Sequence, residues 1–85
     1  MTIVNRLGLH ARPASRIARI ASRFTSEIFL VKEGEEANAK SILEVLTLAS
    51  PKGTELVLRA KGSDAERAVK ALKELVDSGF GDMNG

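Results

Sequence analysis

The feature of this sequence that most limits its fold is an apolar stripe between residues 65 and 76. Its members recur at three- and four-residue steps, as on one face of an α-helix: Ala65, Ala68, Val69, Leu72, Leu75 and Val76. Such a helix needs a second surface on which to bury this face. Because the chain has only 85 residues, that surface must come from a few short elements around one economical core. We therefore predict a single domain over residues 1–85, with residues 81–85 as a mobile tail.

Four segments have the composition or alternation that is typical of β-strands. Residues 2–6 are short and rich in β-branched side chains, and residues 27–32 form a run of β-formers that we expect to be a central strand. A turn at Gly34 would return the chain as a short edge strand over 36–39. Residues 55–60 alternate as in a strand that is covered on one face.

Two further helices are predicted between these strands. Residues 11 to about 23 carry apolar side chains at helical spacing, and a short helix opens at Ser41 and ends before Ser50. Two segments match a capping box, residues 41–44 and residues 63–66. In such a box the serine hydroxyl accepts from the backbone NH of the glutamate, and the glutamate carboxylate accepts from the backbone NH of the serine. At the end of the last helix, Gly79 is predicted to be a left-handed cap. Phe80 would then fold back and contact Leu75.

The resulting order of elements, βαββαβα, contains a split βαβ unit. We predict an α+β fold, an open-faced sandwich with a four-stranded antiparallel sheet and three helices on one face.

Composition excludes several classes of protein. The chain has no cysteine and one histidine, so we expect neither a disulfide nor a metal site, and no cofactor. No apolar run approaches the ~20 residues of a membrane span and no signal-peptide pattern follows Met1, so we expect a cytoplasmic location without membrane insertion. The net charge of +2 allows an acidic partner but is too small to indicate nucleic acid.

The first predicted helix also carries a basic stripe. Arg12, Arg16, Arg19 and Arg23 recur at four, three and four residues, which places their guanidinium groups along one exposed line. The stripe is either a solvated helix face or a docking surface for acidic partners.

The second predicted helix has more apolar residues than a narrow stripe holds. Ile42, Leu43 and Leu46 belong either to the core or to an exposed partner contact.

The only histidine, His10, stands where the first predicted strand turns into a helix. A neutral imidazole is a nucleophile at physiological pH, and the free NH groups of a first helical turn favour an anion beside them. Arg12 adds a fixed cation whose planar fork matches phosphate oxygens, and Pro13 suits the first turn. His10 could therefore carry a phosphate.

The heptapeptide Gly8-Leu9-His10-Ala11-Arg12-Pro13-Ala14 resembles the phosphorylation site of HPr, the histidine-containing phosphocarrier family of the bacterial phosphotransferase system. The resemblance extends to Lys40-Ser41-Ile42-Leu43 and to the order of elements over nearly the whole chain. It implies that His10 accepts a phosphoryl group on Nδ1 from enzyme I and passes it to the A domains of sugar permease components. It further implies a monomeric relay rather than an enzyme with turnover of its own.

The same resemblance implies that Ser41 is a regulatory site. In many relatives a kinase/phosphorylase modifies the matching serine, which weakens phosphorylation by enzyme I and creates a surface for a transcriptional regulator. The alternative is that Ser41 only caps a helix.

Other functions stay open or are disfavoured. A nitrogen-regulatory phosphocarrier of the same family would keep His10, whereas a purely regulatory docking module would not need it. RNA binding is disfavoured because single-strand readers stack bases on aromatic side chains, and this chain has three Phe, no Tyr and no Trp.

Overall fold

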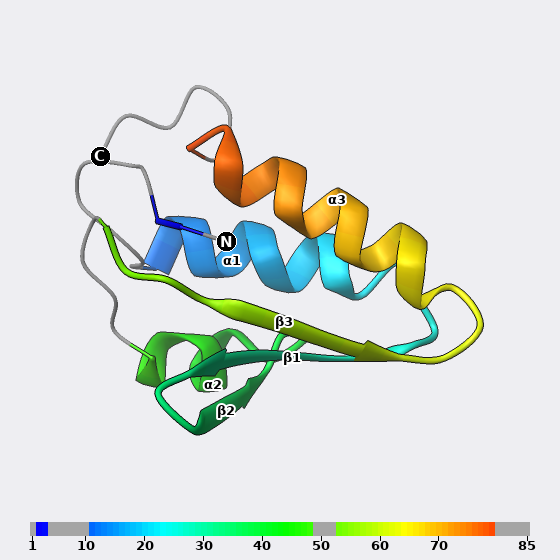
Figure 1. Ribbon diagram of the computed structural model, residues 1–85, viewed down its shortest axis with the longest axis horizontal. Helices are drawn as coiled ribbons and strands as arrows, with labels where there is room; N and C mark the ends of the chain where they lie inside the picture. The colour runs from blue at the N-terminus through cyan, green and yellow to red at the C-terminus, as the bar shows by residue number, and fades with distance from the viewer. Residues whose placement is uncertain (1, 4–10, 49–52, 80–85) are drawn as a thin grey trace.

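The computed structural model describes residues 2–3, 11–48 and 53–79 (Figure 1). Their elements are, in chain order, α1 (Ala11–Ala21), β1 (Glu27–Lys32), β2 (Glu35–Asn38), α2 (Ile42–Thr47), β3 (Val57–Lys61) and α3 (Ala65–Asp77). From residue 11 onward this is the order that the sequence predicts. Within the described residues, no helix is long and apolar enough to cross a membrane.

The three described strands form an antiparallel sheet in the order β2-β1-β3, so β1 is central and β2 lies at an edge, as predicted. Burial alternates along the strands. In β1, Ile28 and Leu30 are buried, while Glu27 is exposed. The covered face packs against the helices, and α1 and α3 lie side by side above it in Figure 1. The sheet is therefore covered on one face and open on the other.

The predicted first strand is only partly described. Thr2 forms an isolated antiparallel bridge with Glu55, and the amide of Ile3 donates to the carbonyl of Thr54 at 2.8 Å. The amide of Gly53 donates back to the Ile3 carbonyl at 2.7 Å. Residues 4–6 lie outside the described residues, so the structure shows three strands and a bridge where the sequence predicts four strands. The predicted tail over 81–85 also lies outside the described residues.

One core joins the helices to the covered face of the sheet. It takes buried residues from all three helices, from β1 and β2, and from Ile3 and Leu56, while Leu58 and Ala60 of β3 pack against it partly buried. Its largest members are Ile3, Ile17, Ile28, Leu30, Leu48, Leu56, Leu72, Val45 and Val76. The stripe of α3 contributes Ala68, Leu72 and Val76, which are fully buried, and Leu75, which packs at the margin. The apolar stripe of α3 thus faces the core as predicted, with its centre fully buried and with Ala65 and Val69 partly buried at its margin.

The turn between β1 and β2 is the predicted hairpin turn. Glu33 and Gly34 both have positive φ, 49° and 83°. Two positive φ values in a two-residue loop match the right-handed twist of the flanking strands. The end of α3 is also as predicted: Gly79 has a φ of 69°, and its amide donates to the Val76 carbonyl at 3.0 Å. Phe80, its predicted partner, lies outside the described residues.

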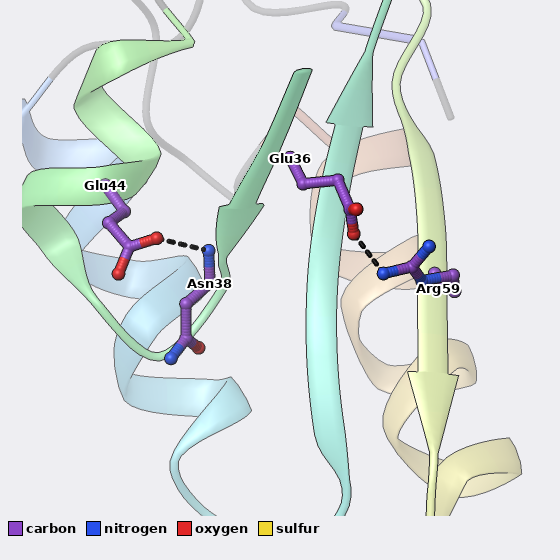
Figure 2. A network of polar contacts seen from close by, with 4 residues as sticks. All are labelled: Glu36, Asn38, Glu44 and Arg59. Carbon is purple, nitrogen blue, oxygen red and sulfur yellow. Dashed lines mark hydrogen bonds and ion pairs between the residues drawn. The ribbon is translucent and has the colours of Figure 1, made fainter. Parts of the chain in front are cut away.

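On the open face of the sheet, Arg59 contacts an aromatic ring and a carboxylate. Its guanidinium lies 5.3 Å from the centre of the Phe29 ring and pairs with the carboxylate of Glu36 across β1 (Figure 2). Both charged side chains are well exposed, so the pair contributes at most about 1 kcal/mol.

The predicted capping box from Ser63 to Glu66 is wrong. The cap position belongs to Asp64, whose carboxylate makes no bond to the helix. Instead it accepts hydrogen bonds from the backbone amides of Thr25 and Ser26, each at 2.9 Å, and from the Ser26 hydroxyl. The carboxylate thereby satisfies two NH groups in the loop between α1 and β1, and Ser26 is buried beneath it. The side chain of Asp64 therefore joins two loops rather than capping the helix.

This contact predicts a pH dependence of stability. The hydrogen bonds, first that from the Ser26 hydroxyl, lower the pKa of Asp64 from 3.8 to about 2. A lowered pKa in the folded state stabilises the fold above pH 4, and this stabilisation is lost as the pH falls through 2. Asp64→Asn should therefore abolish the part of the acid destabilisation that falls between about pH 4 and 2, as measured by melting temperature against pH. Asp77→Asn, at the end of α3, is the matched control. Parallel curves for the Asp64→Asn variant and the wild type would contradict the assignment.

Candidate functional site

Helix α1 begins at Ala11, the residue that follows His10 in the sequence. Its buried face consists of Pro13, Ala14, Ile17, Ala18 and Ala21. The four arginines of the predicted stripe are exposed, and none forms an ion pair with another described residue. The helix ends at Ala21 rather than near residue 23. Arg23 follows in a turn, and its amide donates to the Ile20 carbonyl at 3.1 Å. His10 itself lies outside the described residues.

The apolar residues of α2 are divided between the core and the surface. Val45 and Leu48 are buried, and Leu46 is partly buried against the core. Leu43, with 78% of its surface exposed, and Ile42, with 42%, face solvent. The helix is too short to bury five apolar side chains on one side. Of the two alternatives, core burial therefore holds for one part of the apolar residues of α2, and surface exposure holds for the other part.

A groove of about 500 Å³ lies between α1 and the start of α2. Its lining combines two cations, three hydroxyl groups and apolar side chains: Ser15, Ala18, Arg19, Ser22, Lys40, Ser41, Ile42 and Leu43. The structure thus brings Arg19 together with Ser41 and the two exposed apolar residues of α2. The other predicted site residues, Arg12, Arg16, Arg23 and Leu46, are not part of this lining.

Ser41 is the N-cap of α2. Its backbone is extended, with φ −109° and ψ 114°, and its hydroxyl accepts a hydrogen bond from the amide of Glu44 at 3.3 Å. This half of the predicted capping box is confirmed. The other half is wrong, because the Glu44 carboxylate accepts from the amide of Asn38 at 3.1 Å (Figure 2). The Ser41 amide donates instead to the Asn38 carbonyl at 3.0 Å. The Glu44 carboxylate thus links α2 to the end of β2 through the Asn38 amide.

Lys40 takes part in the site although the sequence reasoning gave it no role. Its ammonium donates to the carbonyl of Phe24, beyond the end of α1, at 2.7 Å, and its amide donates to the Asn38 side chain at 2.9 Å. The residue therefore links the segment after α1 to the start of α2 and is part of the groove lining. Its partner lies 16 residues away, so no local pattern indicates the contact.

The arrangement is suited to an acidic partner with an apolar centre. Exposed guanidinium groups lie along α1, and Ile42 and Leu43 present apolar surface at the groove. No group of metal-ligating side chains is found among residues 2–3, 11–48 and 53–79.

The family model described as the phosphorylation site of the HPr component of the phosphotransferase system matches residues 1–78. The chain belongs to the HPr family. Its curated relatives include phosphocarrier protein HPr of Mycoplasma capricolum, 43% identical over 85% of this chain and 81% of the relative. They also include phosphocarrier protein NPr of Shewanella violacea, 44% identical over 94% of this chain and 88% of the relative.

Solved HPr structures have the same fold. HPr of Thermoanaerobacter tengcongensis superposes with a TM-score of 0.92 at 42% identity, covering 98% of this chain and 93% of that one. The catabolite repression protein Crh of Bacillus subtilis, described as a swapped, intertwined dimer, has a TM-score of 0.79 at 43% identity over 87% of this chain and 85% of its own. The antiparallel sheet and three helices are therefore those of an HPr fold.

Membership in the HPr family establishes the general function. The chain is an HPr-type phosphocarrier protein of the phosphotransferase system.

Proposed function

We propose that His10 is the residue that carries the phosphoryl group. Its Nδ1 atom attacks phosphorus presented by phosphorylated enzyme I, a nitrogen–phosphorus bond forms, and the bond to the donor breaks. In the next step the A domain of a sugar permease component takes the phosphoryl group and the imidazole is restored. The match of residues 1–78 to a phosphorylation-site family is the observation that carries this proposal.

Arg12 is proposed to act on the chemistry. It is exposed in the first turn of α1, two residues after His10. Its fixed charge and the free NH groups of that turn stabilise the negative charge of a phosphoryl group during transfer. This stabilisation needs no metal ion or cofactor in the chain.

The proposal is tested by incubating the protein with enzyme I and phosphoenolpyruvate. Intact mass should show one added phosphoryl group, and phosphorus NMR should show phosphohistidine in the Nδ1 form. A protein that stays unmodified with an active enzyme I would refute the proposal.

Arg16, Arg19 and Arg23 are proposed as the basic part of a docking surface, with Ile42, Leu43 and Leu46 as its apolar part. The groove supports this arrangement, because it places Arg19 beside Ile42 and Leu43. Charges at the rim of an interface mainly change the rate of encounter and its dependence on salt.

Reversal of Arg16 or Arg19 to Glu should slow phosphoryl transfer by up to about tenfold at low ionic strength. The difference from wild type should disappear at high salt, where the charges are screened. Arg67→Glu, on the exposed side of α3, controls for net charge. Wild-type rates at low salt for both variants would show that the stripe is a solvated face.

We propose that Ser41 is also a regulatory phosphorylation site, acted on by a serine kinase/phosphorylase. A phosphate there would stand at a helix N-cap and beside Arg19 and Lys40, which line the same groove. The added charge of about −1.5 to −2 would repel an acidic partner that docks at Ile42 and Leu43. A transcriptional regulator with a basic surface would gain a contact.

Ser41→Asp is expected to fold normally, because aspartate is also a good N-cap, and to accept phosphate from enzyme I more slowly. Ser63→Asp, in the exposed turn before α3, adds the same charge away from the groove. Equal transfer rates in the two variants, together with no phosphoserine in protein from the host, would leave Ser41 as a helix cap alone.

Two alternatives within the family remain. The first is a nitrogen-regulatory phosphocarrier, which would keep His10 and accept phosphate from a different enzyme I; one curated relative is named phosphocarrier protein NPr. The second is a docking module that carries no phosphate, which the match to a phosphorylation-site family disfavours. Labelling with each enzyme I in turn separates these cases. We further propose a monomer, a cytoplasmic location, and a fourth strand over residues 2–6 that continues the pairing seen at Thr2 and Ile3.

A further inference from the structure

Helix α2 has few contacts of its own that fix its position. It spans six residues, of which one, Val45, is buried, and a helix this short is not stable by itself. The buried face of α1, on which it packs, is made mainly of small side chains, since three of its five residues are alanine. Small side chains form shallow ridges, which resist sliding less than large ones do. Polar contacts near the start of α2 therefore have a larger part in setting where this helix lies relative to α1.

Lys40 joins the two helices through its side chain. Its ammonium donates to the carbonyl of Phe24 at 2.7 Å, and Phe24 packs against the core, so the acceptor is held in place. At the other end, the Lys40 amide donates to the Asn38 side chain at 2.9 Å. The preceding residue, Ala39, is buried, and its amide donates to the Ile28 carbonyl at 2.9 Å. Both ends of the Lys40 side chain are thus fixed, one at the segment after α1 and the other at the start of α2.

The Lys40 ammonium differs from the guanidinium groups of the docking surface. Arg19 is exposed and forms no ion pair with another described residue, so a partner can reach its charge. Lys40 is partly buried, and its ammonium already holds a backbone acceptor at short distance. Hydrogen bonds from a charged donor are the stronger kind, and a partner carboxylate would have to compete with this one. The two cations that line the groove therefore differ in what they offer a partner.

We propose that Lys40 is a positioning residue for phosphoryl transfer. By holding the start of α2 to the segment after α1, it sets the spacing between Arg19 on one side of the groove and Ile42 and Leu43 on the other. A partner that contacts all three side chains binds best at one spacing, because a small misplacement weakens contacts that must form together. The inference rests on the docking surface proposed above, and it adds to that surface a residue that acts without touching the partner.

The test measures phosphorylation of the full chain by enzyme I and phosphoenolpyruvate over a range of chain concentrations, at low and at high salt. Lys40→Met keeps the apolar stem of the side chain and removes the ammonium. It should raise KM for the chain by about three- to tenfold at both salt concentrations. The value of kcat should not change, because His10 and Arg12 are intact. Lys40→Arg keeps a charged donor and should restore the wild-type KM. Lys70→Met, on the exposed side of α3, controls for the loss of one positive charge.

Residual dipolar couplings of the backbone amides in α1 and α2 report the angle between the two helices. In Lys40→Met each helix should stay intact while the angle between them changes or is averaged, and Lys40→Arg should match the wild type. Lys40→Gln, whose side chain is neutral and shorter, replaces Lys40→Met in both measurements if that variant does not fold.

A rise in KM that disappears at high salt would overturn the proposal, because the Lys40 charge would then act on the partner directly. An unchanged KM, or a raised KM with the wild-type angle between the helices, would overturn it too. Leu43→Ala separates this failure from a failure of the docking surface. If Leu43→Ala raises KM and Lys40→Met does not, the positioning role alone is wrong. If neither variant raises KM, the docking surface is wrong as well.

Discussion

Replacement of His10 by alanine is expected to abolish phosphorylation by enzyme I. No other side chain in the chain is an imidazole, so no other residue offers a neutral nitrogen nucleophile at pH 7. The label from phosphoenolpyruvate should fall to background, as measured by intact mass. The fold should be unchanged, as measured by circular dichroism and melting temperature.

Arg12→Ala provides a graded comparison for this loss. It removes one charge that stabilises the phosphoryl group but leaves the nucleophile, so the rate of transfer should fall by about 10²- to 10³-fold while the final extent of labelling is kept. A His10→Ala protein that still takes up phosphate, or a label mapped to another residue, would refute the assignment of His10.

Replacement of Gly62 by alanine is expected to produce the largest loss of stability from a single added methyl group. Gly62 has a φ of 149°, and a Cβ atom there would lie 2.7 Å from the Cα of Ser26. Ser26 is buried and hydrogen-bonded to Asp64, so it has little freedom to move. We expect a loss of about 3 kcal/mol in the free energy of unfolding and a fall of roughly 10 to 20 °C in melting temperature.

Gly34→Ala separates the two causes of this loss. Gly34 also has a positive φ, 83°, but no atom lies within 4 Å of the position that a Cβ would take. Its replacement should therefore cost only the backbone strain, about 1 kcal/mol. Equal losses of stability in the two variants, measured by urea unfolding, would show that the approach of Gly62 to Ser26 is not tight.

The sequence predicted those parts of the fold that follow from short-range patterns. Helical spacing located α1 and α3, and the position of Gly34 located the hairpin turn, because each depends on residues a few places apart. Bounds moved by one or two residues: β3 begins at Val57 rather than Glu55. The excess of apolar residues in α2 correctly predicted that some of them are exposed.

The errors concern side chains whose partners are distant in the sequence. Glu44 matched a local capping pattern and Asp64 stood inside another without a role, yet each carboxylate has a backbone partner outside its own helix. Asp64 reaches a loop 38 and 39 residues earlier, where two free amide groups need an acceptor. Lys40 is a third case, because its partner is the carbonyl of Phe24. For the site, the sequence predicted Arg19, Ser41, Ile42 and Leu43 individually, but only the packing of α1 on α2 places them along one groove.

The central position of β1 has a consequence for synthesis of the chain on the ribosome. Glu27 of β1 is paired with Lys61 of β3, so the sheet cannot be completed until the ribosome has added the residues between them. At about 5 to 20 residues per second this takes a few seconds. During that interval β1 has only the hairpin with β2, which is marginal by itself. Its apolar residues Ile28 and Leu30 then stay uncovered until α3, the last of the described elements, has been synthesised. Cooperative folding of the sheet is thus postponed until α3 has left the ribosome.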